Sequence, residues 1–191
     1  MKNGLMFAID VDGVVRDILT QMILTYNNRY GGYFEKISMK DFTEYDLAKF
    51  NSPAIANPSY WFFDLMAHET FYLAKPYENA LEAMHILTEM GDVTLVTKQT
   101  CQDAITYTVK WLYKYDVPYN NLCFVSNRKS IVGNNFDYFV DDYVKNFEHS
   151  NAKTNILIRQ PYNTNLELFD KNFILKDNLY QFANDLKHGK L

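Results

Sequence analysis

The chain has 191 residues, of which 48% are hydrophobic and 22% are charged, values that describe a globular protein and exclude long disordered tracts. Its formal net charge is −4, without a block of five or more basic residues, so the sequence lacks the basic surface by which proteins bind a nucleic acid polymer. The short apolar run near the N-terminus is interrupted by Asp10, so we expect neither a signal peptide nor a membrane span, and we expect a cytoplasmic protein.

A strand and a helix are predicted first. Residues 5–9 form an apolar run that ends in an Asp-x-Asp-Gly turn, which is typical of a buried strand. From Asp17 onward, apolar residues recur at helical spacing, and the glycine pair at 31–32 provides a stop. The sequence therefore predicts a strand followed by an amphipathic helix.

The next part of the chain reads as a small helical insertion. Residues 33–75 lack the alternation of a strand and carry prolines and aromatic clusters, which favours short helices, among them roughly 41–50 and 58–67. We therefore expect a helical cap over residues 17–75 and an α/β core domain made of residues 1–16 and 76–191.

Strands and helices alternate regularly after the insertion. Helices are predicted from Ala80 to Gly91, over 102–115 and at the C-terminus, each with one apolar face. Parallel strands need crossover connections, so short apolar strands separated by helices predict a doubly wound parallel α/β sheet. Its five expected strands cover residues 5–9, 92–97, 122–125, 136–140 and 155–158.

Polar residues follow several of these strands. In an open parallel sheet, ligands bind beyond the carboxyl ends of the strands. The residues at or just after these ends include carboxylates, a hydroxyl and an ammonium group: Asp10, Asp12, Thr97, Lys129 and Asp141.

Each of these residues also has an ordinary structural explanation. An Asp-x-Asp-Gly turn is more often structural than catalytic, because Asp and Gly are common turn formers. Thr97 fits the start of a turn, Lys129 fits a solvated loop, and the pair at 141–142 fits a helix cap. Their common place after predicted strands, and their order along the chain, favour a shared role.

The carboxylates predict a magnesium site. Asp10 and Asp12 would share one face of a continuing strand, and the repulsion between them is relieved by a divalent cation. Mg²⁺ prefers oxygen ligands and commonly uses one or two carboxylates together with a substrate phosphate. Asp141 or Asp142 would supply a further carboxylate, whereas the four histidines show no ligand spacing.

The same residues fit phosphoryl transfer through a covalent intermediate. A carboxylate attacks phosphorus if the charge of the transferred group is neutralised and the leaving oxygen is protonated. Asp10 would be the nucleophile and Asp12 the general acid and base. The Thr97 hydroxyl, the Lys129 ammonium and backbone N–H groups would bind the phosphate oxygens.

This ordered set resembles the haloacid dehalogenase-like phosphohydrolases over almost the whole chain. The segments that match the four motifs of that family are Asp10-Val11-Asp12-Gly13-Val14, Leu95-Val96-Thr97, Lys129 and Val140-Asp141-Asp142. The spacing between the first two motifs leaves room for the cap that the family inserts there.

Within that family, the chain is most similar to the 5'(3')-deoxyribonucleotidases. The resemblance rests on an extended first motif that continues to Asp17, on the cap return at 71–76 and on the segment 126–130. It implies a nucleoside monophosphate substrate and Mg²⁺ held by Asp10, Asp12 and Asp141, with Asp12 binding through its carbonyl.

The substrate pocket shows departures from these nucleotidases. Lys98 replaces a small or polar residue after Thr97, which implies a more cationic phosphate pocket, and Ile18 stands where an aromatic residue often lines the base pocket. Phe71 and Tyr72 match the apolar pocket of the family, and Trp61 is a further candidate. Packing within the cap explains these aromatic residues about equally well.

The main hypothesis is therefore a magnesium-dependent 5'-nucleotidase that forms a phospho-aspartate. One alternative is a phosphatase of the same chemistry for another small phosphometabolite, because the cap sets specificity. Another is a nucleotide-binding protein of the same fold without turnover. We expect a small-molecule nucleotide as partner, no nucleic acid polymer and no membrane, and we leave a homodimer open.

Overall fold

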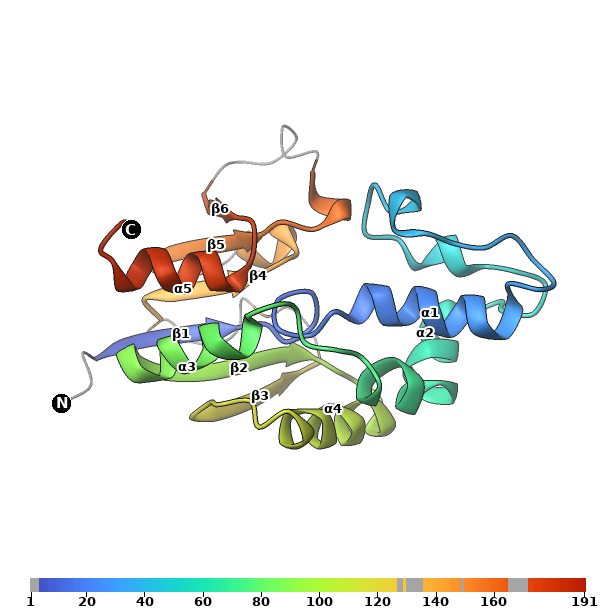
Figure 1. The fold of residues 1–191 in the computed structure, drawn as a ribbon, viewed down its shortest axis with the longest axis horizontal. Helices are drawn as coiled ribbons and strands as arrows, with labels where there is room; N and C mark the ends of the chain where they lie inside the picture. Colours follow the sequence, from blue (N-terminus) through green and yellow to red (C-terminus); the bar gives the residue numbers. More distant parts are fainter. Residues whose placement is uncertain (1–3, 127–128, 130–135, 149, 165–171) are drawn as a thin grey trace.

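A parallel sheet forms the centre of the computed structural model, which describes residues 4–126, 129, 136–148, 150–164 and 172–191. The strand order is β3-β2-β1-β4-β5-β6 (Figure 1), and every pairing is parallel. The predicted parallel α/β sheet is confirmed, but the predicted number of five strands is wrong. β6 was missed because a three-residue edge strand leaves too short an apolar pattern to recognise. The strands are β1 (Leu5–Ile9), β2 (Gly91–Lys98), β3 (Asn121–Val125), β4 (Tyr138–Asp141), β5 (Thr154–Ile158) and β6 (Ile174–Lys176).

The register of the central strands brings their polar ends together. Ile9 of β1 pairs with Leu95 of β2 on one side and with Val140 of β4 on the other. The backbone N–H of Asp10 continues the ladder by donating to the carbonyl of Val140 at 2.9 Å. The residues that follow these pairs, Asp10 and Asp141, therefore leave the sheet at the same edge.

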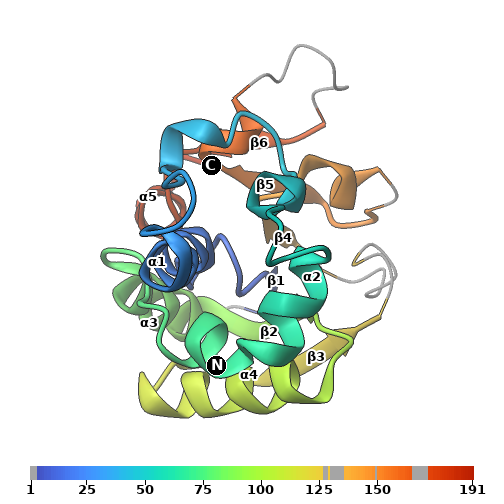
Figure 2. The same cartoon turned by 90° about the vertical axis from the view of Figure 1, so that its right-hand side faces the viewer.

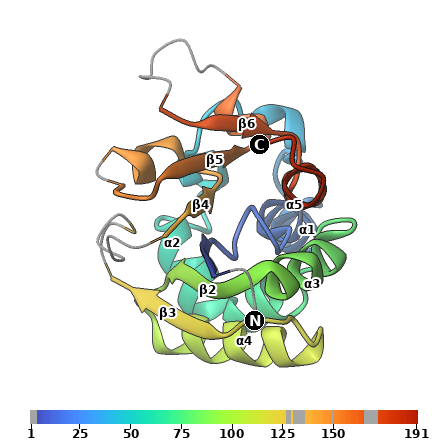
Figure 3. The same cartoon turned by 90° about the vertical axis from the view of Figure 1, so that its left-hand side faces the viewer.

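The α-helices of the sheet domain cover one face of the sheet (Figure 3). Apolar residues of α3 (Ala80–Met90), α4 (Gln102–Lys114) and α5 (Leu179–Lys187) share one core cluster with Phe7 and Ile9 of β1. On the opposite face, within the described residues, helical cover comes from the 3₁₀ turns, chiefly η6 (Val144–Phe147), whose Phe147 packs with Ala8. The doubly wound arrangement that we expected is thus seen in the described part with only a short turn on the second face.

A helical insert follows β1, as predicted, and it has an apolar core of its own (Figure 2). Its first helix is capped by the Asp17 side chain, which accepts a hydrogen bond from the Thr20 N–H at 3.2 Å. Where we expected helices at 41–50 and 58–67, the structure has two 3₁₀ turns and one helical stretch that includes two π-helical segments. The elements are α1 (Ile18–Tyr30), η1 (Met39–Asp41), η2 (Leu47–Phe50), α2 (Pro58–Tyr60), η3 (Trp61–Leu65) and η4 (His68–Tyr72).

The insert joins the sheet domain at two neighbouring chain crossings. The N–H of Asp17 donates to the carbonyl of Lys75 at 2.9 Å. These two residues are the first and last of the cap that we predict. Those boundaries, 17 and 75, remain a prediction. Among the described residues, no helix has both the length and the apolar character needed to cross a bilayer.

Candidate active site

A tight turn after β1 presents Asp10 and Asp12. Three backbone hydrogen bonds close it. The Val11 carbonyl accepts from Val15 N–H at 2.9 Å and from Arg16 N–H at 2.8 Å, and the Arg16 carbonyl accepts from Gly13 N–H at 3.0 Å. Gly13 has a φ of +79°, in the left-handed region that favours glycine. The N–H of Val11 also donates to the Asp10 carboxylate at 2.6 Å, so the turn orients that side chain.

Three buried carboxylates meet at the ends of β1 and β4. Oxygen atoms of Asp10, Asp141 and Asp142 all lie within 4.8 Å of one another. Lys129 contacts the Asp10 carboxylate and lies 3.2 Å from Asp141. The structure therefore brings together Asp10, Lys129 and Asp141, which the sequence analysis placed at or after the ends of three different strands.

The electrostatics of this cluster are those of crowded negative charge. Burial raises the pKa of Asp10 well above its ordinary value; Lys129 lowers it, and the neighbouring carboxylates raise it further. Burial and the charge of Asp141 raise the pKa of Asp142 to about 7. Burial by itself lowers the pKa of Lys129, but the charges of Asp10 and Asp141 outweigh that effect and raise it.

The donor set fits a hard divalent cation. All three side chains offer oxygen ligands, and their mutual repulsion exceeds what one lysine can neutralise. Asp141 is also held in place, because its oxygens accept from the Asn146 amide at 3.0 Å and from the Tyr143 N–H at 2.8 Å.

Asp12 lies apart from the carboxylate cluster. Its Oδ1 accepts from Arg16 Nε at 2.7 Å, and its Oδ2 accepts from Gln99 Nε2 at 2.9 Å. We expected metal ligands at Asp10, Asp12 and Asp141, whereas the side chains that converge are Asp10, Asp141 and Asp142. A metal contact by the Asp12 carbonyl stays a prediction.

The predicted phosphate-binding residues line one cavity with Asp10 and Asp12. Thr97 is buried, and its hydroxyl has no hydrogen-bond partner within the described structure. Lys129 is buried in the same lining, whereas Lys98, the last residue of β2, is exposed. Of the predicted segment 126–130, residues Asn127, Arg128 and Ser130 lie outside the described residues.

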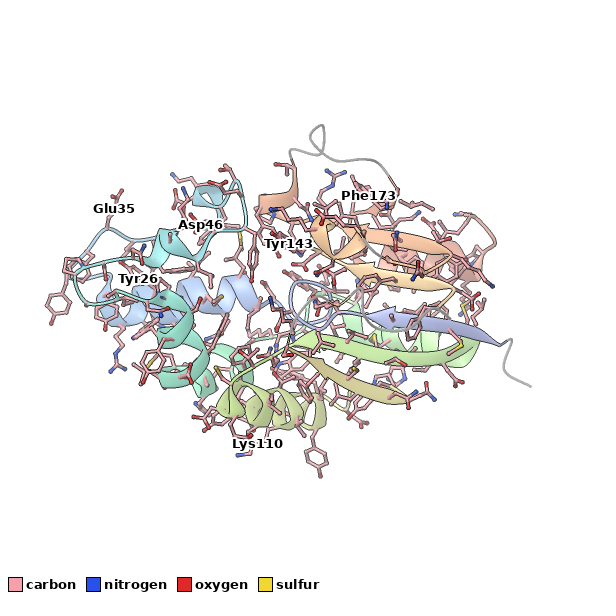
Figure 4. The ribbon with its side chains drawn as sticks, turned by 180° about the vertical axis from the view of Figure 1, so that it is seen from behind. Tyr26, Glu35, Asp46, Lys110, Tyr143 and Phe173 are labelled. Carbon is pink, nitrogen blue, oxygen red and sulfur yellow. The ribbon has the colours of Figure 1, made fainter. Side chains whose placement is uncertain are left out.

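The insert supplies an apolar roof over this polar floor. The cavity has a volume of about 340 Å³, within the range of small-molecule sites. Asp46 of the insert and Tyr143 of the sheet domain both line it and lie on facing sides (Figure 4). The apolar lining from the insert consists of Ile18, Leu19, Met22, Phe42, Leu47, Phe63 and Phe71.

Two of the four predicted pocket residues line this cavity, Ile18 and Phe71, and two do not. Trp61 is turned into the core of the insert, where its ring lies 4.7 Å from that of Phe62. Tyr72 packs instead against Lys114, whose ammonium lies 4.6 Å from the ring centroid.

Sequence reasoning missed several lining residues. Phe42 and Phe63 belong to the aromatic clusters noted in the sequence, but nothing there separated them from Trp61. Gln99, two residues after Thr97, gave no signal, and its amide contacts Asp12.

Comparisons with known proteins agree with this geometry. Residues 4–179 match the model of the family described as 5' nucleotidase, deoxy (pyrimidine), cytosolic type C protein. No curated protein matches the sequence.

Solved structures of haloacid dehalogenase-like hydrolases share the fold. A family member from Streptococcus pneumoniae aligns with a TM-score of 0.67 at 10% identity, covering 100% of both chains. One from Xanthomonas campestris gives 0.59 at 8% identity, covering 98% of this chain and 96% of the other. The L-2-haloacid dehalogenase from Xanthobacter autotrophicus gives 0.62 at 12% identity, covering 96% and 98%.

Proposed function

Because the chain belongs to the 5' nucleotidase, deoxy (pyrimidine), cytosolic type C family, a family of phosphomonoester hydrolases, we propose that it hydrolyses nucleoside monophosphates through a phospho-aspartate at Asp10. The observation that carries this proposal is the convergence of Asp10, Lys129 and Thr97 on the polar floor of one cavity. Phosphate oxygens accept hydrogen bonds, and the unpaired Thr97 hydroxyl and the ammonium of Lys129 are suitable donors.

The proposed reaction has two steps. In the first, the Asp10 carboxylate attacks phosphorus, the bond from phosphorus to the nucleoside oxygen breaks, and Asp12 gives that oxygen a proton. In the second, Asp12 takes a proton from water, whose oxygen attacks phosphorus, releasing phosphate and the free Asp10 carboxylate. Lys129 offsets negative charge at Asp10 throughout.

We propose that Mg²⁺ is held by Asp10, Asp141 and Asp142, with the Asp12 carbonyl as a further candidate ligand. When bound, Mg²⁺ would neutralise charge on the phosphoryl oxygens and on the carboxylates. Asn146 and the Tyr143 N–H keep the Asp141 carboxylate oriented for this role.

The nucleoside is proposed to occupy the apolar part of the cavity, next to Ile18 and Phe71. Stacking of a base on an aromatic ring contributes roughly 1–3 kcal/mol, and the family description names deoxy and pyrimidine nucleotides. Deoxypyrimidine monophosphates are therefore the first substrates to test. We also propose a cytoplasmic location, which the same description supports. Lys98, exposed at the cavity, would attract the phosphate.

Phosphate release from a substrate panel tests the proposal. The panel contains 5' and 3' monophosphates of ribo- and deoxyribonucleosides, sugar phosphates and phospho-amino acids. We expect hydrolysis of nucleotides with Mg²⁺, loss of turnover on chelation with an unchanged circular dichroism spectrum, and recovery on adding Mg²⁺ back. Preference for a sugar phosphate would instead support the alternative phosphatase.

The Asp10→Asn variant is the control for the nucleophile. We expect it to fold and to release no phosphate, because an amide is not a nucleophile of comparable strength. Acid-quenched wild-type protein incubated with ³²P-labelled nucleotide should carry label, and the variant should not. Equal turnover by both proteins would rule out a phospho-aspartate at this residue.

A further inference from the structure

A fully buried arginine, Arg16, closes the turn that carries Asp12. Its side chain is 0% exposed and donates through three nitrogen atoms. Nε binds Asp12 at 2.7 Å, Nη1 binds the Phe71 carbonyl at 3.2 Å, and Nη2 binds the Thr108 hydroxyl at 3.0 Å. One guanidinium thus connects the catalytic turn, the insert and helix α4.

Two aromatic rings hold the guanidinium in place. Its central carbon lies 5.0 Å from the ring centroid of Phe71 and 5.0 Å from that of Trp111. A buried arginine is costly unless it is paired and hydrogen-bonded. Within the described residues, Asp12 is the carboxylate that forms its ion pair, so the position of each side chain depends on the other.

The carboxylate of Asp12 is fixed at both oxygens. Arg16 occupies Oδ1, and Gln99 donates to Oδ2 from the end of β2. With a donor on each oxygen, the carboxylate has little freedom to rotate. Gln99 lines the cavity together with Asp12, whereas Arg16 does not.

We propose that Arg16, with Gln99 on the second oxygen, is a positioning residue that holds the Asp12 carboxylate for proton transfer to the leaving oxygen. This inference rests on the proposed function, in which Asp12 is the general acid. A small misplacement of a catalytic group is expensive in rate, and a guanidinium immobilised by three hydrogen bonds and two rings prevents it.

The test compares two substrates that differ in their need for a proton. The substrates are a nucleoside monophosphate and 4-nitrophenyl phosphate. The nucleoside is a poor leaving group as an alkoxide and needs general acid catalysis, whereas 4-nitrophenolate is a stable anion and needs little. Single-turnover release of each leaving group is measured with enzyme in excess, for the wild type and for Arg16→Lys, Gln99→Leu, Asp12→Asn and Thr108→Val. Rates are expressed per folded protein, determined by circular dichroism and urea titration.

We expect Arg16→Lys to slow nucleoside release by about 10- to 100-fold and nitrophenolate release by less than about threefold. Asp12→Asn should show a larger difference between the slowing of nucleoside release and the slowing of nitrophenolate release, and Gln99→Leu should show a smaller difference. Thr108→Val is the matched control: it removes a buried hydrogen bond from the same guanidinium without touching Asp12, so both substrates should slow equally or not at all.

Equal slowing of both substrates by Arg16→Lys, with selectivity retained in Asp12→Asn, would overturn the inference and make Arg16 a purely structural residue. If Arg16→Lys does not fold, Gln99→Leu gives the answer, because a fixed carboxylate must also depend on its second donor. If Asp12→Asn slows the release of both leaving groups equally, the acid role of Asp12 in the proposed function is refuted, and the inference fails with it.

Discussion

Gly13 shows how one residue type is required for the turn that follows Asp10. Its backbone is left-handed, with φ at +79°, and a Cβ placed there would lie 2.0 Å from Oδ2 of Asp142. A methyl group would therefore meet both backbone strain and a buried carboxylate that belongs to the proposed metal cluster.

Gly13→Ala should lower both stability and activity. The left-handed backbone costs about 1–2 kcal/mol for a residue with a Cβ, and displacement of Asp142 adds to that and disturbs the cluster. Gly189→Ala separates the two effects, because φ is +64° there but nothing lies within 4 Å of the added Cβ. Urea unfolding and phosphate release measure both variants; equal losses of stability would show that the contact with Asp142 does not matter.

Thr97 shows the opposite relation between stability and function. Its buried hydroxyl has no partner within the described structure, so Thr97→Val should raise the free energy of unfolding by about 1 kcal/mol. The same change should slow phosphate release about 100-fold, as expected for loss of one donor to the transferred group.

Thr70 provides the control for that prediction. Its hydroxyl is also buried without a partner in the described part, but Thr70 lies in η4 and does not line the cavity. Thr70→Val should stabilise the protein to a similar degree in urea unfolding while leaving turnover unchanged. A matching loss of turnover in both variants would mean that Thr97 acts through packing.

At the scale of elements, the helical insert has its own core. Phe50 is fully buried there, with ring centroids 4.7 Å from Phe62 and 5.3 Å from Phe42. This cluster is separate from the one that α3, α4 and α5 form on the sheet. The insert should therefore lose its packing without unfolding the sheet.

Phe50→Ala should destabilise the insert by about 3–5 kcal/mol and raise KM, because Phe42 and Leu47 of the cavity wall belong to the same apolar cluster. Hydrogen exchange should increase in α1 and η2 and stay slow in β1 and β4. Phe182→Ala, in α5, is the matched truncation in the sheet domain: it should lower global stability with KM unchanged for the folded protein. Uniform exchange in Phe50→Ala would contradict an independent core.

At the scale of the whole molecule, an aromatic contact connects the insert with the sheet domain. The ring of Tyr45 lies 5.3 Å from that of Tyr143 and 5.3 Å from that of Tyr162, and all three residues line the cavity. The Tyr162 hydroxyl in turn contacts Asp142. The position of the insert is thereby linked to the cluster of buried carboxylates.

Tyr45→Ala should weaken this contact and raise KM by about three- to tenfold, since each aromatic pair contributes roughly 0.5–1.5 kcal/mol. Tyr33→Ala is the control, because Tyr33 belongs to the same insert, is 84% exposed and does not line the cavity. Steady-state kinetics on the best nucleotide of the panel distinguishes the two, and an equal change in both would argue against a specific contact.

The main strands and the residues that follow them could be predicted from the sequence. Short apolar runs are local patterns, and in a parallel sheet the carboxyl ends of strands meet at one edge, so the grouping of Asp10, Thr97, Lys129 and Asp141 followed from their order alone. The absence of strand alternation and the proline content of residues 33–75 likewise predicted a helical insert. β6 was missed because three residues carry too little pattern.

Only the tertiary structure decided which side chains face the cavity. The π-helical segments η3 and η4 advance by a wider turn than an α-helix, so the periodicity of the sequence does not tell that Phe63 and Phe71 face the cavity while Trp61 and Tyr72 face away. The partners of Asp12 were equally hidden, because Gln99 is 87 positions away along the chain and Arg16 acts through contacts with α4 and the insert. Local sequence patterns were enough to predict the identity and order of the candidate site residues. The orientation of their side chains depends on packing between segments that only folding brings together.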